Sequence, residues 1–242
     1  MATTSIEWTD KTWNPVTGCT KISAGCQNCY ANVMTNRLRG MHNPKYFNGF
    51  KVTLHTEDLQ EPQKWKKNSM VFVCSMSDLF HKDVPFEFID KVFDVIRKTP
   101  QHTYQVLTKR AERMNEYLKD RDIPTNTWIG VTVENKSVRY RMDYIRNLSA
   151  KVKFISCEPL LEDLGELNLV GIDWIIVGGE SGVQARPMKE DWVMNIKRQA
   201  DDNNIPFFFK QWGTWGADGI KRNKKVNGKL LNGDIIQRMP IK

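Results

Sequence analysis

A regular alternation of short apolar runs with amphipathic helical patterns, beginning near residue 50, constrains the fold of this chain most strongly. The β-rich runs span Lys51–His55, Met70–Met76, Thr103–Lys109, Thr127–Glu134, Lys151–Glu158, Asp173–Glu180 and Pro206–Trp212. The helix candidates between them span Pro62–Lys67, Phe86–Lys98, Ala111–Lys119, Ser137–Asn147 and Lys189–Asn203. Continuous apolar strands that alternate with helices are typical of parallel sheets covered by helices. The sequence therefore predicts an α/β fold.

The number of strand–helix units indicates a particular α/β architecture. A further strand near Ile6–Trp8 brings the predicted strands to about eight, which fits a TIM-like (β/α) barrel, complete or nearly complete. No linker or low-complexity tract divides the chain, so we expect a single domain over residues 1–242. Residues 214–242 are predicted to be a C-terminal extension that forms a basic hairpin from Lys221 onward.

Composition narrows the class of protein. The chain is 40% hydrophobic and carries a formal net charge of +8, which attracts polyanions, so nucleic acid or a nucleotide is a candidate partner. No apolar run approaches the roughly 20 residues of a membrane span, and the first residues do not resemble a signal peptide. We therefore expect a cytoplasmic monomer with no membrane partner.

Three of the five cysteines crowd into one short segment. Cys19, Cys26 and Cys29 form a C-x6-C-x2-C run whose glycines allow the three thiolates to point at one centre. The spacing predicts a metal site, and by itself it leaves zinc, an iron–sulfur cluster and no metal open. Cys74 and Cys157 lie in apolar strand-like runs and are predicted to be buried small hydrophobes.

Polar residues follow six of the predicted strands, at the end where (β/α) barrels carry their active sites. They are Ser75, Ser77, Asp78, Thr108, Lys109, Arg110, Thr132, Glu134, Ser156, Glu158, Gly178, Gly179, Glu180, Lys210 and Gln211. A barrel that served only as a scaffold would need no such ring, so the sequence predicts a functional site there.

Six segments in order resemble a known family: Trp13–Cys19, Gly25–Ala31, Gln105–Arg110, Ser156–Leu161, Gly178–Gly182 and Phe208–Gly213. Together they resemble the phage-associated three-Cys-motif family of the radical S-adenosylmethionine (SAM) superfamily. The cysteine spacing departs from the C-x3-C-x2-C of most of that superfamily. Asn28 also stands where an aromatic residue often precedes the last cysteine, with Tyr30 as a possible substitute.

The resemblance implies a 4Fe–4S cluster held by Cys19, Cys26 and Cys29, with SAM on the fourth iron and an external electron donor such as flavodoxin or ferredoxin. SAM cleavage would give a 5′-deoxyadenosyl radical that abstracts hydrogen from the substrate. The implied cofactor contacts are Tyr30, Ser75, Ser77, Thr108, Glu134, Ser156, Gly178, Gly179 and Glu180. The implied catalytic or substrate-binding residues are Lys109, Arg110, Glu158, Lys210 and Gln211, with Glu180 and Arg186 as further substrate candidates.

The resemblance also suggests a substrate. The nearest functional picture in the family is an isomerase of phage DNA hypermodification, active in the host cytoplasm, that converts glycine-modified thymidine, in DNA or as a nucleotide, from an N-linked to a C-linked form. Trp212 or Trp215 could stack on a flipped base, although ordinary packing also explains them. One alternative is another radical SAM reaction on a base, either methylation or photoproduct repair with Cys157 as hydrogen donor. The other is a non-catalytic zinc or iron–sulfur nucleic-acid-binding protein.

Overall fold

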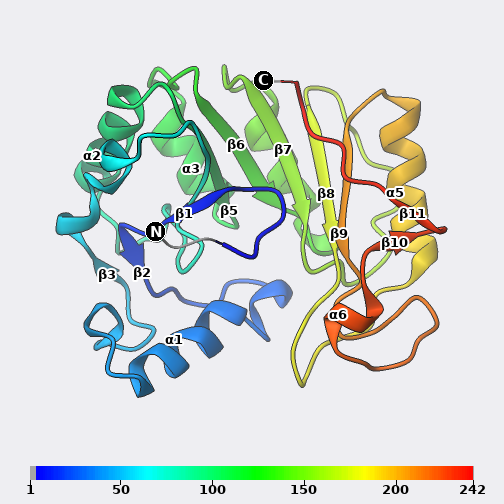
Figure 1. The fold of residues 1–242 in the computed structure, drawn as a ribbon. Coiled ribbons are helices and arrows are strands. Elements are labelled where there is room, and N and C mark those ends of the chain that lie inside the picture. Colours follow the sequence, from blue (N-terminus) through cyan, green and yellow to red (C-terminus); the bar gives the residue numbers. More distant parts are fainter. Residues whose placement is uncertain (1–3, 242) are drawn as a thin grey trace. The chain divides into compact units, whose positions relative to one another are not determined.

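The computed structural model describes residues 4–241 and confirms the α/β fold (Figure 1). One seven-stranded sheet has the order β1-β4-β5-β6-β7-β8-β9. Its strands are β1 (Lys11–Trp13), β4 (Met70–Val73), β5 (Thr103–Thr108), β6 (Thr127–Thr132), β7 (Val152–Cys157), β8 (Trp174–Gly178) and β9 (Phe207–Gln211). The pairs β1/β4, β4/β5, β7/β8 and β8/β9 are parallel, as the alternation with helices predicts.

In the described part of the chain, five α-helices lie between these strands, and α6 follows β9. They are α1 (Tyr30–Gly40), α2 (Phe86–Lys98), α3 (Ala111–Leu118), α4 (Asp143–Arg146), α5 (Glu190–Asp202) and α6 (Lys224–Asn227). Turns of 3-10 helix span Ala24–Cys26, Pro44–Tyr46, Thr56–Asp58, Glu61–Lys64 and Lys136–Met142. Within residues 4–241, none of the helices combines the length and the apolar character that a bilayer crossing requires.

The chain folds into two compact units that interleave along the sequence. Unit 1 comprises residues up to 22, residues 29–130 and residues 148–151, whereas unit 2 comprises residues 23–28, 131–147 and 152 onward. The boundary between the units falls within β6. The cysteine motif is also divided, since Cys19 and Cys29 belong to unit 1 and Cys26 belongs to unit 2.

Unit 1 is built on strands β1, β4 and β5. Its core contains the rings of Trp13 and Tyr104, whose centroids lie 5.8 Å apart. Helices α2 and α3 pack against each other, because Phe93 contacts the Tyr117 ring and the Tyr117 hydroxyl donates to Asp90 at 2.7 Å. A separate antiparallel pair, β2 (Val16–Thr17) with β3 (Thr53–Leu54), completes this unit.

Unit 2 is built on strands β7, β8 and β9, with α5 beside β9 (Figure 1). The Trp174 ring packs against Phe154 and Phe208. The β8/β9 register passes from the pair Val177–Phe209 to the pair Gly178–Gln211 and so skips Lys210. Such a β-bulge re-aims the extra side chain.

The C-terminal segment carries one more two-stranded sheet. Strands β10 (Leu230–Leu231) and β11 (Asp234–Ile235) are antiparallel and are joined by Asn232 and Gly233. These two residues have φ of 51° and 86°, the left-handed region that a two-residue hairpin turn requires. The basic run before the pair lies around the short helix α6.

Two predicted strands are wrong in position. The first strand is β1 rather than Ile6–Trp8, and Trp8 instead packs on Phe72 with 4.7 Å between ring centroids. The run Lys51–His55 forms only β3, outside the main sheet. The chain there pairs with the cysteine-motif segment, since Cys19 N–H donates to the Phe50 carbonyl at 3.1 Å. The main sheet therefore has seven strands rather than about eight.

Two predicted helices are also shorter or wound differently. The segment Pro62–Lys67 contains only the 3-10 turn Glu61–Lys64, after which Trp65 adopts an extended conformation. The segment Ser137–Asn147 is 3-10 helix up to Met142, followed by the four-residue α4. Within that 3-10 segment, Arg141 turns inward and becomes 2% exposed.

Candidate functional site

In unit 1, the Arg110 side chain lies beside the sulfur of Cys19. Its Nη1 atom lies 3.5 Å from Cys19 Sγ and 3.1 Å from Asp78 Oδ2, while Nη2 donates to the Thr20 carbonyl at 2.9 Å. Burial alone would lower the pKa of Arg110, but the charges of Asp78 and Cys19 raise it above its ordinary value. The guanidinium therefore stays charged next to a predicted metal ligand.

Asp78 organises this end of β5. Its Oδ1 accepts from the Thr108 hydroxyl at 2.7 Å, and its Oδ2 accepts from the Lys109 amide at 3.1 Å. The Thr108 hydroxyl in turn accepts from the Arg110 amide at 2.9 Å. Thr108, which the family resemblance implies as a cofactor contact, thus helps to shape the loop that presents Arg110.

A buried histidine supports the same loop. His81 Nδ1 accepts from the Asp83 amide at 3.1 Å, so the Nε2–H donates to Thr20 Oγ1 at 2.8 Å. Burial, followed by the charge of Arg110, lowers the pKa of His81 and keeps the ring neutral near pH 7. Thr20 therefore receives donors from both His81 and Arg110, which fixes the residue after Cys19.

Tyr30, Ser75 and Ser77 lie at one end of the unit 1 strands. The Tyr30 hydroxyl donates to the Ser75 carbonyl, and Ser75 Oγ donates to Asn14 Oδ1 at 3.1 Å. Ser77 Oγ donates to the Gly18 carbonyl at 2.5 Å. The two serines brace the cysteine-motif segment, whereas the Tyr30 side chain remains 55% exposed.

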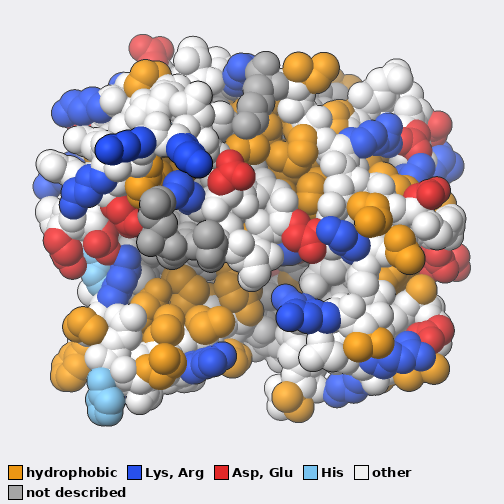
Figure 2. Space-filling model, in the orientation of Figure 1, with side chains coloured by type: hydrophobic (Ala, Val, Ile, Leu, Met, Phe, Trp, Pro, Cys, Tyr) orange, Lys and Arg blue, Asp and Glu red, His pale blue; other side chains and the backbone are white. Residues whose placement is uncertain are grey.

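Helix α1 has two distinct faces. Apolar side chains gather in the region of this helix in Figure 2. Two apolar residues of the helix are exposed, Val33 at 68% and Met34 at 40%. A pocket of about 660 Å³ opens on a polar side of the same helix. Its lining consists of Thr20, Asn32, Asn36, Arg39, Asn48, Gly49, Phe50, Lys51, Val52 and Asp83. Two cations against one acid, together with three amide groups, suit an anionic, hydrogen-bonding ligand.

In unit 2, a buried ion pair holds the loop that contains Cys26. Glu134 is 0% exposed, and its Oε1 accepts from the Gly25 amide at 3.1 Å. Arg141 Nη1 donates to Glu134 Oε2 and to the Thr132 carbonyl, both at 2.9 Å. A Cβ on Gly25 would lie 3.1 Å from the Glu134 carboxyl, so any larger residue would make the carboxyl give way by a few tenths of an ångström.

A second pair grips the same loop. Arg186 donates to both oxygens of Glu180 and also to the Ala24 carbonyl at 3.0 Å. Asn28 Nδ2 donates to Glu180 Oε2 at 3.1 Å. Burial by itself would raise the pKa of Glu180, but the hydrogen bonds from Arg186 and Asn28 lower it, so the carboxylate is ionised at pH 7.

The bulged Lys210 forms a third pair in unit 2. Its Nζ lies 2.6 Å from Glu158 Oε1, and Ser156 Oγ donates to Glu158 Oε2 at 3.2 Å. Gln211 Nε2 donates to the Gly179 carbonyl at 3.1 Å. Four of the predicted site residues thus lie at the carboxyl ends of β7 and β9, with both charges already paired.

Gly179 marks a point where two strand ends touch. A Cβ there would lie 1.8 Å from the Trp212 carbonyl oxygen. Trp212 is buried, and its indole donates to the Leu230 carbonyl at 2.8 Å. The Trp215 indole donates to the Ala185 carbonyl at 2.6 Å. Packing and hydrogen bonding therefore account for both tryptophans that were considered for base stacking.

The five cysteines separate into two groups. Cys19, Cys26 and Cys29 are partly exposed and form no disulfide. Cys74 and Cys157 are buried as predicted, and burial raises the pKa of both thiols far above the ordinary value. Only the motif cysteines are therefore exposed enough to bind a metal as thiolates.

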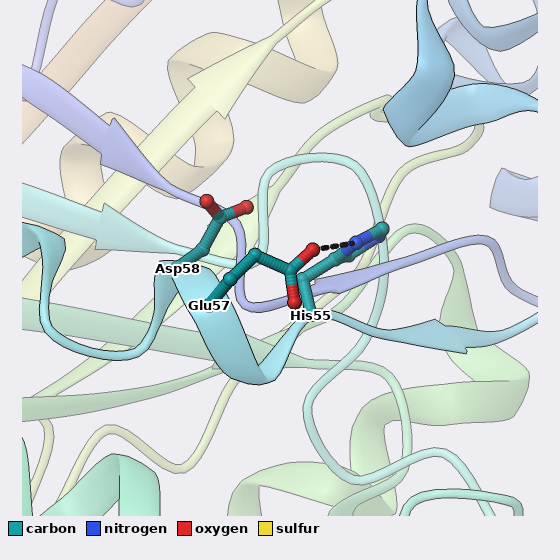
Figure 3. Close-up of side chains that lie close together, drawn as sticks. All are labelled: His55, Glu57 and Asp58. Atoms are coloured by element: carbon teal, nitrogen blue, oxygen red, sulfur yellow. Dashed lines mark ion pairs between the residues drawn. The ribbon is translucent and has the colours of Figure 1, made fainter.

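Among the described residues, one cluster brings potential metal-ligating atoms within 4.8 Å of one another, and it is His55, Glu57 and Asp58 rather than the three motif cysteines (Figure 3). His55 Nδ1 lies 3.4 Å from Glu57 Oε1, and its Nε2 lies 2.8 Å from the Thr17 hydroxyl. Asp58 is already paired with Lys45. Both ring nitrogens and one carboxylate thus have protein partners, so the cluster fastens β3 to β2.

The chain matches one family model, described as a protein of unknown function (DUF5131), over residues 3–240. The chain belongs to the DUF5131 family. No curated protein matches it. Because the family description names no function, membership in the DUF5131 family assigns no chemistry to the cysteine motif or the polar strand ends.

Solved structures of spore photoproduct lyase share the fold of this DUF5131 protein. The lyase complexed with dinucleoside spore photoproduct has a TM-score of 0.51 at 12% identity, covering 83% of this chain and 63% of that chain. A cysteine-to-serine mutant of the lyase has a TM-score of 0.50 at 14% identity, covering 74% and 58%. The DUF5131 chain thus spans about three fifths of the lyase, and at this identity the likeness concerns the fold alone.

Sequence reasoning missed several residues that organise the site. Asp78 was noted only as a strand-end residue, and Arg141, Asn28 and His81 were given no role. Asp78, Arg141 and Asn28 bind predicted site residues, and His81 acts only through Thr20, next to Cys19. Residues that meet only in the folded chain have no characteristic spacing in the sequence. Asn28 is the exception that the sequence could have indicated, because it is a polar residue inside the cysteine motif.

Proposed function

We propose that this DUF5131 protein is a radical SAM enzyme that acts on a nucleic-acid base. The observation that carries the proposal is the cysteine set. The three cysteines of the C-x6-C-x2-C motif are partly exposed and form no disulfide, while the other two are buried. Three thiolates suit a 4Fe–4S cluster that keeps one iron open for a cofactor.

The residues around the motif fit such a cluster. Cys19 has a charged guanidinium beside its sulfur, and the loop with Cys26 is fixed by Glu134 and Arg186. Hydrogen bonds and fixed charges around thiolate ligands are the means by which proteins tune iron–sulfur centres. When bound, the cluster and SAM would supply one-electron cleavage of a sulfonium and removal of hydrogen from an unactivated carbon.

The Lys210–Glu158 pair supports a base as the substrate. A cation and a carboxylate held side by side offer a donor next to an acceptor. A thymine edge presents the complementary pattern, an N3–H donor flanked by carbonyl acceptors. Because Glu158 already neutralises Lys210, the pair suits such a neutral edge better than a free carboxylate.

The pocket beside α1 supports an anionic substrate. Arg39 and Lys51 lie in its wall with three asparagines, and the chain carries eight excess positive charges. Lysine and arginine contacts to phosphates supply most non-specific affinity for nucleic acid. The pocket also borders Thr20, the residue after Cys19, so a strand bound there would run near the cysteine motif.

For the reaction, we propose isomerisation of glycine-modified thymidine from the N-linked to the C-linked form. Its support is the family resemblance of the six sequence segments. Photoproduct repair is the second candidate, favoured by the lyase fold and by the dinucleoside bound to one of those structures. The complete burial of Cys157 argues against this cysteine as the hydrogen donor that repair would need.

One experiment tests both levels of the proposal. The protein would be purified anaerobically, reconstituted with iron and sulfide, and incubated with SAM, reductant and DNA that contains either glycinyl-thymidine or spore photoproduct. We expect 5′-deoxyadenosine together with an isomeric nucleoside from the first substrate, detected by mass spectrometry. Repaired thymines would favour the lyase reaction, and a colourless zinc protein without SAM cleavage would support the binding module instead.

A further inference from the structure

The loop that carries Cys26 cannot fix its own shape. Ala24–Cys26 forms a single turn of 3-10 helix, and no side chain caps its start. Its local backbone bonds run from the Cys26 amide to the Ser23 carbonyl at 3.0 Å and from the Gln27 amide to the Ala24 carbonyl at 3.2 Å. Turns of this kind have poor hydrogen-bond geometry and depend on their surroundings.

Those surroundings are two arginine–carboxylate pairs. Glu134 binds the Gly25 amide, directly before the cysteine. Arg186 binds the Ala24 carbonyl and also donates to Gln27 Oε1 at 3.3 Å. Glu180, held by Arg186, binds Asn28 at 3.1 Å. The contacts therefore grip the loop on both sides of Cys26.

The two pairs differ in burial in a way that suits this role. Glu134 and Arg141 are 0% and 2% exposed, so the first anchor is part of the unit 2 core. Arg186 is 29% exposed, and its guanidinium reaches from Glu180 to the loop backbone. A rigid carboxylate thus holds one side of the turn, and an arginine with several donors holds the other.

We propose that Glu134 and Arg186 are positioning residues that hold the Cys26 loop in its metal-binding shape before the metal arrives. The inference rests on the proposed function, because it takes Cys26 as a cluster ligand. It reassigns Glu134, which the family resemblance implies as a cofactor contact, and Arg186, which it implies as a substrate candidate. A ligand loop that is already ordered loses less conformational freedom on binding, and loss of such supporting partners typically costs about 10–100-fold in metal affinity.

The test compares variants that release the loop with variants that do not. Arg186→Ala removes the contacts to Ala24 and Gln27, and Arg186→Lys keeps the charge but loses the fork. Gly25→Ala crowds the Glu134 carboxyl at 3.1 Å without removing an ion pair. Matched controls are Arg198→Ala, an exposed arginine paired with Glu166, and Gly40→Ala, where a Cβ meets nothing within 4 Å.

Two readouts are taken on each protein. Hydrogen exchange of residues 23–28 in the metal-free chain reports the order of the loop, and iron content with thiolate-to-iron absorbance after reconstitution reports metal binding. We expect Arg186→Ala and Gly25→Ala to exchange faster in this segment than in the rest of unit 2 and to bind iron about 10–100-fold more weakly. Arg186→Lys should fall between them and wild type, and both controls should match wild type.

The outcomes separate this proposal from the proposed function. If wild type takes up iron and the variants take up as much with equal affinity, the positioning role is overturned and the enzyme proposal stands. Unchanged exchange in residues 23–28 of Arg186→Ala and Gly25→Ala would also overturn it. If wild type binds no metal, both proposals are wrong.

Discussion

Arg110 places its Nη1 atom 3.5 Å from the sulfur of Cys19 while the same nitrogen lies 3.1 Å from the Asp78 carboxylate. The sequence assigned Arg110 to the substrate. In the structure the guanidinium also binds Thr20, so its donors are directed to the protein. A fixed positive charge and a hydrogen bond at a cysteine ligand stabilise electron density on the sulfur and favour the reduced form of an iron–sulfur cluster.

Substitution of Arg110 is therefore expected to make the cluster harder to reduce. Arg110→Lys keeps the positive charge but loses the planar guanidinium that donates to Cys19, Asp78 and Thr20 at once. Without the hydrogen bond to the Cys19 sulfur, the reduction potential of the cluster should become more negative and SAM cleavage should slow. The measurement is a redox titration followed by electron paramagnetic resonance. Arg97→Ala, which removes an exposed arginine of α2, serves as the control. A potential that stays at the wild-type value would contradict the role given to Arg110.

Replacement of single cysteines should divide them into the two groups seen in the structure. Cys26→Ala is expected to abolish stable cluster binding at little cost to folding, because its side chain is partly exposed. Cys157→Ala should keep the iron but lower the free energy of unfolding by about 1 kcal/mol, because it opens a small void in the core. Iron content and urea unfolding of each variant provide the measurement. Loss of iron in Cys157→Ala alone would be incompatible with this division.

The buried pair of Glu134 and Arg141 should matter strongly for stability. Arg141→Met leaves the Glu134 carboxylate uncompensated in the core, which is expected to lower the free energy of unfolding by about 3–5 kcal/mol. Arg198→Met removes an exposed pair and should change it by no more than about 0.5 kcal/mol. Denaturant unfolding of the three proteins checks the difference. Similar values for the two variants would show that the buried pair adds no special stability.

The pocket beside α1 gives a prediction for nucleic-acid binding. Arg39→Ala should weaken binding of a single-stranded oligonucleotide and reduce the slope of log affinity against log salt by about one. Binding of a free nucleoside, which has no phosphate, should not change. Lys91→Ala, an exposed cation on α2 outside the pocket, is the control. Fluorescence anisotropy at several salt concentrations is the measurement, and equal slopes for Arg39→Ala and wild type would exclude a phosphate contact.

Buried histidines should make the fold sensitive to mild acid. Burial lowers the pKa of His102 below its ordinary 6.5, and its Nδ1 has no hydrogen-bond partner to stabilise a proton. Below about pH 6.5 the unfolded chain therefore binds a proton that the folded chain does not, so the free energy of unfolding falls as the pH falls. Each such histidine contributes up to about 1.4 kcal/mol per pH unit.

The urea midpoint measured between about pH 7.5 and pH 5.5 checks this expectation, since that interval spans the ordinary histidine pKa. His55 and His81 have lowered pKa values as well, with burial as the first cause, and add to the slope. His102→Asn should reduce the slope relative to wild type while leaving one of similar sign. A stability that is flat over this interval would mean that the folded chain accepts these protons.

Elements that depend on contacts between residues close in the sequence were predicted well, and elements that depend on distant residues were not. The bounds of Phe86–Lys98 agree with α2 because its apolar residues recur on one face, a local pattern. The run Lys51–His55 was misplaced because its partner, β2, lies over thirty residues earlier, and a two-residue antiparallel pair has no signature. The 3-10 winding of Lys136–Met142 likewise accompanies the inward turn of Arg141 toward Glu134.

The candidate site was also predicted only in part. Cysteine spacing predicted Cys19, and the polar ends of strands predicted Arg110 and Glu134, because a motif and a strand end can both be recognised in the sequence. Which atoms these residues bind could not be read, since Asp78 and Arg141 reach them only in the folded chain. Their roles toward cofactor and substrate stay predictions.

The close approach of Gly179 to the Trp212 carbonyl changes how relatives of this chain should be compared. Any larger side chain at this position would force the ends of two neighbouring strands apart, so the glycine is demanded by steric exclusion alone. A glycine at this position in a distant homologue would then indicate that the two proteins share the packing of these strand ends. It would not indicate that they catalyse the same reaction. Divergence in activity within the family is better traced at Glu158 and Lys210, which pair at the carboxyl ends of β7 and β9.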